Sequence, residues 1–241
     1  MLSFPIGPTI GFWRMFNVRT SDKILLFLIF IMVPVALYFA FAYAPEERVM
    51  GVVQRIFYFH VSSAWTSLLS FFFVFVGGTL YLWKNDKRFD HFAYAAAELG
   101  VFFCTIVIVT GPIWAKPVWN VWWTWDPRLT STFVLWLIFV AYLILRSSLA
   151  DHPAIRKYAS VYGIIGFIDV PIVYLSIYWW RTIHPRVISP AKVDLHPKMW
   201  YSVLICWATI LLLYTLLMKL RIRMERLKEE VQILQERVQE D

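Results

Sequence analysis

Charged side chains are scarce in this sequence. Asp, Glu, Lys and Arg make up 16% of the 241 residues, whereas 60% are hydrophobic and the mean hydropathy is +0.61. So few charges cannot cover the surface of a soluble domain of this size, and the apolar surface needs lipid. The sequence therefore predicts an all-α polytopic membrane protein. The net charge of +7 does not indicate nucleic acid, because basic residues of membrane proteins collect on cytoplasmic loops.

Cysteine is also rare, and a phosphate-binding glycine loop is missing. Cys104 and Cys206 each lie in a long apolar run without a second Cys, a His or an acidic residue at ligand spacing. They are expected to be small buried hydrophobic residues, which excludes a redox pair and a cysteine metal site. The sequence contains no Gly-x-x-x-x-Gly-Lys motif. Any dependence on ATP must therefore come from a separate subunit.

The sequence is instead rich in long hydrophobic runs. A bilayer core needs about 20 apolar residues per helix, and six segments reach that length. They are residues 22–44, 56–83, 91–111, 129–149, 157–180 and 197–218. Residues 1–219 are thus expected to form one six-helix transmembrane domain. An even number of spans places both termini on the same side of the membrane.

The distribution of Lys and Arg predicts which side that is. The two termini and the loops on their side carry 15 of these residues, whereas the opposite side carries 8. Cytoplasmic segments are enriched in Lys and Arg, so the N- and C-termini are predicted to be cytoplasmic. The loops 112–128 and 181–196 then face outward.

The chain turns polar after the last predicted span. In residues 220–241, apolar residues recur at alternating steps of four and three, at Leu220, Met224, Leu227, Val231, Leu234 and Val238. This spacing predicts a short cytoplasmic helix with a heptad stripe. Such a helix can pack on a partner subunit or on a second copy, or it can rest on lipid headgroups, and the sequence leaves these alternatives open.

The outward loop 112–128 is unusually rich in tryptophan. Five of the thirteen tryptophans fall within twelve residues, at Trp114, Trp119, Trp122, Trp123 and Trp125. An aromatic belt needs only a few Trp or Tyr at each helix end, and so short a loop cannot bury this aromatic surface by itself. Planar rings suit the face of a porphyrin, and the nearby Arg128 suits its propionates. The loop therefore indicates a haem platform.

Haem iron needs axial ligands, most often histidine, and the predicted spans divide the five histidines between the two sides of the membrane. His91 and His152 are expected in cytoplasmic loops. His60, His184 and His196 are expected at the outer face. His196 directly precedes Pro197 at the start of the last span, which is typical of a capping residue. His60 and His184 remain as the candidate ligands.

These motifs together resemble a known family. Residues 122–130, Trp-Trp-Thr-Trp-Asp-Pro-Arg-Leu-Thr, resemble the "WWD" signature of the haem-handling proteins of cytochrome c maturation. Residues 54–60, Gln-Arg-Ile-Phe-Tyr-Phe-His, precede the signature, and residues 179–184, Trp-Trp-Arg-Thr-Ile-His, follow it. With six spans, the chain is similar over nearly its full length to the CcmC (haem exporter protein C) members of that family.

The resemblance implies specific roles for these residues. His60 and His184 would be the axial ligands of a haem b carried as cargo at the outer face. Arg55 and Arg128 would contact its propionates, with Arg181, Arg186 and Lys116 as further cations near the site. The platform, which also docks a haem chaperone, would consist of Trp114, Trp119, Trp122, Trp123, Trp125 and Asp126.

The family also implies partners and a location. The chain would deliver haem to the membrane-anchored periplasmic chaperone CcmE during c-type cytochrome biogenesis. It would not be an enzyme itself, but a subunit of an ABC-type complex in the bacterial inner membrane with the ATPase CcmA, the membrane subunit CcmB and the small single-span CcmD.

Two other functions remain open from the sequence. A haem-translocating permease would need a polar path through the bundle, for which Asp169 and Glu98 are the only candidates inside predicted spans 157–180 and 91–111. Asp169 is more simply a hydrogen-bonding partner for backbone groups freed by Pro171. A quinol-linked haem oxidoreductase would usually carry histidine pairs within the bundle, and this sequence places none there.

Overall fold

The computed structural model describes residues 19–149, 152, 154–182, 184 and 194–240. Within these residues it is helical and contains no strand. Six helical stretches are long and apolar enough to cross a membrane, which confirms the six predicted spans. They are Thr20–Tyr43, Val52–Lys84, Lys87–Trp119, Pro127–Ser148, Ile155–Trp179 and Pro197–Gln239.

The first span is helix α2 (Thr20–Tyr38), which continues as the π-helical turn η1 (Phe39–Tyr43). A 3₁₀ turn η2 (Val52–Arg55) leads into α3 (Ile56–Lys84). The remaining helices are α4 (Lys87–Trp119), α5 (Pro127–Ser148), α6 (Ile155–Gly166), α7 (Asp169–Trp179) and α8 (Pro197–Glu240).

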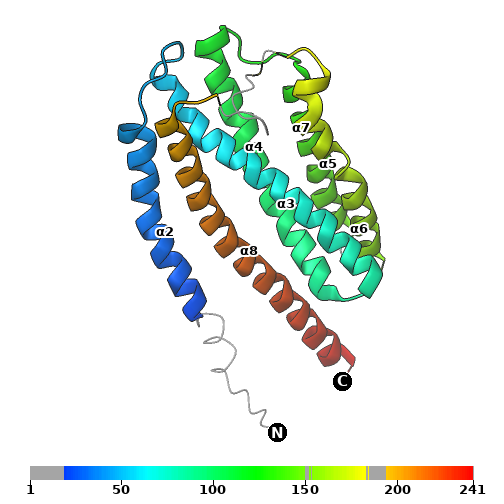
Figure 1. Ribbon diagram of the computed structural model, residues 1–241. Helices are drawn as coiled ribbons and strands as arrows, with labels where there is room; N and C mark the ends of the chain where they lie inside the picture. The colour runs from blue at the N-terminus through cyan, green and yellow to red at the C-terminus, as the bar shows by residue number, and fades with distance from the viewer. Residues whose placement is uncertain (1–18, 150–151, 153, 183, 185–193, 241) are drawn as a thin grey trace.

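Helices α3 and α4 lie at the centre of the bundle (Figure 1). Helix α8 packs against both of them and against α2 on one side, and α5, α6 and α7 lie on the other side. The start of α2 and the end of α8 lie at the same end of the bundle, here called the terminal end (Figure 1). The opposite end, here called the site end, carries the α2–α3 and α4–α5 connections and the end of α7. The cytoplasmic location of the terminal end stays a prediction.

The contact between α3 and α4 is the most extensive in the bundle. The buried face of α3 carries small residues at Ser62, Ser63, Thr66, Ser67, Ser70, Gly77 and Gly78. Small residues let helix backbones approach closely in a membrane. The hydroxyl of Ser70 donates to the carbonyl of Ala96 on α4 (2.6 Å) and lies 2.8 Å from the hydroxyl of Tyr214 on α8. A single serine therefore links three helices.

Large side chains fill the space that small ones leave. A Cβ on Gly100 of α4 would lie 2.5 Å from Cε1 of Phe71 on α3, so only glycine fits there. The ring of Phe71 in turn stacks on Phe139 of α5, with 3.9 Å between the ring centroids. This interlocking fixes the position of α3 along α4 and along α5.

The fifth span, expected as one helix over 157–180, is broken. Helix α6 ends at Gly166 and α7 begins at Asp169. Proline has no N–H and its ring collides with the carbonyl four residues earlier. For Pro171 that carbonyl belongs to Phe167, which lies in the break. Oδ2 of Asp169 is buried without a hydrogen-bond partner among the described residues, so the expected bond from this atom to a freed backbone group is not observed.

The third span extends further than the sequence suggests. Residues 112–128 were expected to form a loop, yet α4 continues through Pro112 and Pro117 to Trp119. In a bilayer no water can satisfy free backbone groups, so a helix is retained even where proline removes individual bonds. The connecting loop is therefore short, from Asn120 to Asp126.

The predicted C-terminal helix is not separate from the last span. Helix α8 runs without a break through 44 residues, from Pro197 to Glu240. Its polar half is attached to the bundle by ion pairs: Arg221 donates to Glu98 (2.7 Å), and Lys219 and Arg223 each approach Asp22 to 2.7 Å. Glu98 is thus engaged in an ion pair. The apolar stripe of the heptads stays largely exposed at Met224, Val231, Leu234 and Val238.

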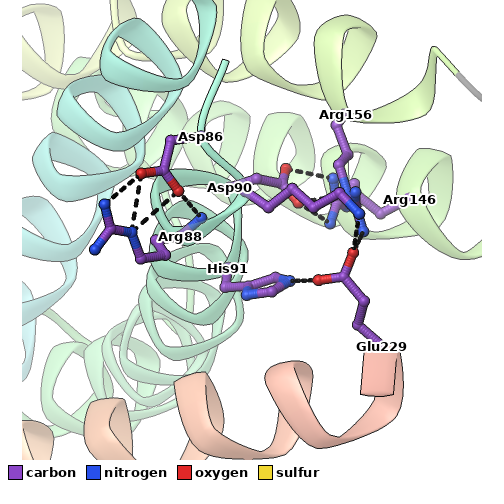
Figure 2. A network of polar contacts seen from close by, with 8 residues as sticks. Asp86, Arg88, Asp90, His91, Arg146, Arg156 and Glu229 are labelled. Carbon is purple, nitrogen blue, oxygen red and sulfur yellow. Dashed lines mark hydrogen bonds and ion pairs between the residues drawn. The ribbon is translucent and has the colours of Figure 1, made fainter. Parts of the chain in front are cut away.

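A second network at the terminal end joins α4, α5, α6 and α8 (Figure 2). Asp90 of α4 is 1% exposed and accepts two hydrogen bonds from Arg146 of α5, at 2.6 and 3.0 Å. Arg156 of α6 bridges Asp90 (3.2 Å) and Glu229 of α8 (3.1 Å). Glu229 also contacts Lys87 (2.5 Å) and His91 (3.1 Å).

Replacing Asp90 with Asn should destabilise the bundle strongly. The change leaves Arg146 buried opposite an uncharged amide, and removing one partner of a buried ion pair costs about 3–5 kcal/mol. The measurement is the unfolding temperature in detergent. Asp86→Asn is the matched control, because Asp86 pairs locally with Arg88 at the surface and Asn caps a helix as well as Asp does. Equal unfolding temperatures for the two variants would show that the network does not stabilise the fold.

Candidate functional site

A cavity opens at the site end between α3, α4, α5 and α7. Its empty volume is about 890 Å³, including the part open to solvent. Both His60 and His184 line it, together with Arg128. Its inner end is mainly apolar, formed by Leu68, Cys104, Leu135 and Val173 beside Ser67. The structure thus brings into one cavity two histidines that are 124 positions apart in the sequence.

Trp114 contacts both of these histidines. Its ring centroid lies 5.9 Å from that of His60 and 6.5 Å from that of His184. The Trp114 side chain is 3% exposed and packs further against Phe57 and Trp119. The rings of the two histidines are therefore positioned by a buried aromatic wall.

His60 has one ring nitrogen engaged. It lies in the second turn of α3, and its Nδ1 is 2.9 Å from the hydroxyl oxygen of Thr110 on α4. Nε2 has no hydrogen-bond partner among the described residues. One nitrogen is thus used for orientation, and the other is free to bind a ligand.

His184 lies just beyond the end of α7, and its backbone N–H donates to the hydroxyl of Thr182 (2.9 Å). Its Nδ1 is buried without a hydrogen-bond partner in the part of the chain that the structure describes. Burial lowers the pKa of His184 to about 3, and the charges of Arg128 and His60 act in the same direction. The imidazole is therefore neutral near pH 7, which is the form that binds metals.

The five tryptophans of the signature region fall into two groups. Trp114, Trp119 and Trp123 line the cavity. Trp122 and Trp125 are instead 59% and 74% exposed, and they present their rings on the outer surface. One group can contact a bound ligand, and the other is available to a partner or to lipid.

Asp126 begins the helix that carries Arg128. Its carboxylate accepts a hydrogen bond from the backbone N–H of Arg128 (2.9 Å), and Pro127 occupies the first helical position. An acidic N-cap followed by proline is a strong helix start. The platform role expected for Asp126 stays a prediction. Its position shows that it also caps α5, and the Asp-Pro pair is the sequence signal for such a cap.

The expected cations lie at different distances from the cavity. Arg128 lines it, whereas Arg55 does not: the guanidinium of Arg55 donates to the carbonyl of Phe41 and lies over the Phe41 ring. Lys116 donates to the carbonyl of Asn120 at the end of α4 (3.0 Å). Arg181 lies with Trp125 in a shallow surface hollow. Arg186 lies outside the described residues.

The other histidines have structural partners. His196 accepts from the backbone N–H of Lys198 (3.2 Å) at the start of α8, which confirms the capping role. His152 accepts from Ala154 (3.1 Å) beside α6. His91 is not in a loop as expected: α4 begins at Lys87, because Asp86 caps it, and His91 is buried beside Glu229.

The fold and this cavity define a class of protein: a multi-pass membrane protein with two histidines, an arginine and a tryptophan wall in one pocket at the end of its bundle. The family model CcmC, described as Heme exporter protein C, matches residues 8–237. The chain belongs to the Heme exporter protein C family.

Individual relatives agree with this assignment. A ccmC-like mitochondrial protein of cytochrome c biosynthesis from Marchantia polymorpha is 33% identical over 188 residues, which cover 78% of this chain and 80% of that protein. Heme exporter protein C of Escherichia coli strain K12 is 34% identical over 144 residues, or 60% of this chain and 59% of that protein. The Bradyrhizobium diazoefficiens protein of the same name is 33% identical over 63% of this chain and 56% of its own length.

The capping role of Asp126 predicts different effects for two substitutions. Asp126→Ala removes the acceptor and should cost about 0.5–2 kcal/mol of stability, whereas Asp126→Asn should retain most of it because Asn caps equally well. Thermal unfolding of both variants in detergent is the measurement. An equal loss in both variants would contradict the capping role and would point to the negative charge itself.

Proposed function

We propose that this chain binds haem b at the site end and delivers it to a periplasmic haem chaperone of the CcmE type during c-type cytochrome biogenesis. Membership of the Heme exporter protein C family supports a role in haem handling for cytochrome c biogenesis. Beyond this role, we assign the residues that hold the haem and the partner to which the haem passes.

The observation that carries the proposal is the convergence of His60 and His184 on one cavity. Bis-histidine ligation needs two neutral imidazoles with free nitrogen atoms. Nε2 of His60 makes no hydrogen bond among the described residues, and Nδ1 of His184 is a buried atom without a hydrogen-bond partner among them. A buried polar atom without a partner is unfavourable unless a ligand satisfies it. A haem iron is a partner that suits both nitrogen atoms.

The rest of the cavity fits both the acidic propionates and the apolar ring of a porphyrin. Arg128 is a planar, bidentate donor suited to a propionate. The apolar inner end of the cavity suits the hydrocarbon edge of the ring, and Trp114, Trp119 and Trp123 suit its face. Arg55, which lies outside the cavity lining, remains a second candidate for a propionate contact on the basis of the resemblance.

Delivery requires a partner that can reach the bound haem. Trp122 and Trp125 are exposed, and together with Asp126, which lines a surface hollow with Trp125, they form our proposed docking surface for the chaperone. The chain would act as a haem-transfer subunit of an ABC-type complex in the bacterial inner membrane. CcmA would supply ATPase activity, and CcmB and CcmD would be its membrane partners. The terminal end would face the cytoplasm.

The arrangement favours haem presentation over haem translocation. A permease needs polar groups along a path through the bundle, yet the inner end of this cavity is mainly apolar. Glu98 is occupied by Arg221, and Asp169 does not line the cavity. Electron transfer across the membrane would need a second pair of histidines near the terminal end. In that region His91 contacts Glu229, and His152 accepts a hydrogen bond from the backbone N–H of Ala154 just before α6.

The axial ligands are tested by absorption spectra of the purified protein in detergent, with and without the co-expressed chaperone. The wild type and His196→Ala should carry a low-spin haem spectrum, because His196 only caps α8. His60→Ala and His184→Ala should lose or alter that spectrum. Four equally haem-free proteins, even with the chaperone present, would remove the haem assignment.

The docking surface is tested by the double substitution Trp122→Ala and Trp125→Ala. Both side chains are exposed, so the haem spectrum should stay as in the wild type, while co-purification of the chaperone should fall about tenfold or more, as expected for aromatic hot spots of an interface. Trp83→Ala is the matched control, since Trp83 is 79% exposed at the terminal end. If the double variant recovers as much chaperone as this control does, the docking surface lies elsewhere.

A further inference from the structure

Thr110 lies where it can determine which ring nitrogen of His60 carries no proton. It belongs to α4, whereas His60 belongs to α3, and Oγ1 of Thr110 lies 2.9 Å from Nδ1 of His60. The same oxygen lies 2.7 Å from the carbonyl oxygen of Ile106, one turn earlier in α4. The hydroxyl therefore has two close neighbours but only one proton to donate.

The short distance between the two oxygens decides where that proton goes. Two oxygen atoms 2.7 Å apart repel each other unless a hydrogen lies between them, and a carbonyl oxygen carries none. The hydroxyl of Thr110 must therefore donate to Ile106. Its remaining lone pairs can only accept, so the proton of the second bond must come from Nδ1 of His60. This leaves Nε2 as the unprotonated nitrogen of a neutral imidazole.

The ring is also fixed in place by its surroundings. It packs beside Trp114, and a Cβ on Gly111 would lie 3.6 Å from its Cε1, so the imidazole rests directly against α4. Because α4 supplies Thr110, Gly111 and Trp114 together, one helix sets both the orientation and the tautomer of a histidine that belongs to its neighbour.

We propose that Thr110 is a positioning residue that holds His60 as the Nδ1–H tautomer and thereby keeps the lone pair of Nε2 available for the haem iron. The part concerning iron rests on the proposed function, whereas the part concerning the tautomer does not. Partners of this kind typically act on a metal ligand by fixing its tautomer and orientation and by raising its basicity.

The first experiment measures the tautomer without haem. The protein is labelled with ¹⁵N-histidine, purified haem-free in detergent, and studied by NMR above the usual pKa of histidine, with the His60 signals assigned by their loss in His60→Gln. The wild type should show a protonated Nδ1 and an unprotonated Nε2. Thr110→Val, which has a similar shape but no hydroxyl, should shift the signals toward the Nε2–H tautomer, and Thr110→Ser should restore the wild-type pattern.

A matched control is available on the same helix. The hydroxyl of Thr105 donates to Val101 (2.8 Å) and accepts from Nε1 of Trp136 (2.9 Å), so it makes an equivalent pair of bonds away from His60. Thr105→Val should leave the His60 signals unchanged. A wild-type protein in the Nε2–H form, or an unchanged tautomer in Thr110→Val, would overturn the proposal.

The second experiment titrates haem into the same proteins and follows the low-spin absorption band. Thr110→Val should bind haem about 10- to 100-fold more weakly than the wild type, whereas Thr110→Ser and Thr105→Val should bind it as the wild type does. A shifted tautomer with unchanged haem affinity would refute the positioning role. If His60→Ala itself binds haem normally, the proposed axial ligand fails and the iron role of Thr110 fails with it, while the NMR result still reports the tautomer independently.

Discussion

The close contact between α3 and α4 is the constraint on which the rest of the structure depends. Small residues on α3 allow the two backbones to approach, and the pairing of Phe71 with Gly100 fixes their positions along one another. The same two helices carry His60 and its neighbours Thr110 and Trp114 at the site end. A displacement of one helix by even one residue, about 1.5 Å, would separate the histidine from its hydrogen-bond partner. In a membrane, packing and interhelical hydrogen bonds must hold such a register, because burial of apolar surface from water does not drive helices together there.

Interhelical ion pairs collect at one end of the bundle, and the candidate site lies at the other. At the terminal end, ion pairs link α2, α4, α5, α6 and α8 through Asp22, Asp90, Glu98 and Glu229. At the site end, the described residues around the cavity meet mostly through aromatic contacts and single hydrogen bonds. The terminal end is thus held together by ionic contacts, and the cavity lies at the opposite end.

Hydropathy alone predicts the six spans, because each run meets the length that a bilayer requires. The number of spans predicts which loops share a side, and two of the three histidines expected on the outer side, His60 and His184, line one cavity. The break before Asp169 was within reach of the sequence, since Pro171 disrupts the helix four residues upstream. The pairing of Glu98 with Arg221 and the contact of Thr110 with His60 were not, because each depends on how distant helices align. The ligand, propionate and docking roles of the site residues, and the cytoplasmic orientation, stay predictions.

The length of α3 also serves as a ruler for the bilayer. His60 lies in the second turn of α3 and Lys84 is its last residue, and the 24 steps between them correspond to about 36 Å. The hydrocarbon core of a membrane is about 30 Å thick. With Lys84 among the headgroups of one leaflet, His60 comes to lie at the boundary between acyl chains and headgroups of the other leaflet. An amphiphilic ligand held there keeps its apolar body at the depth of the lipid tails while its acidic groups reach water, so the lipid itself contributes to its orientation.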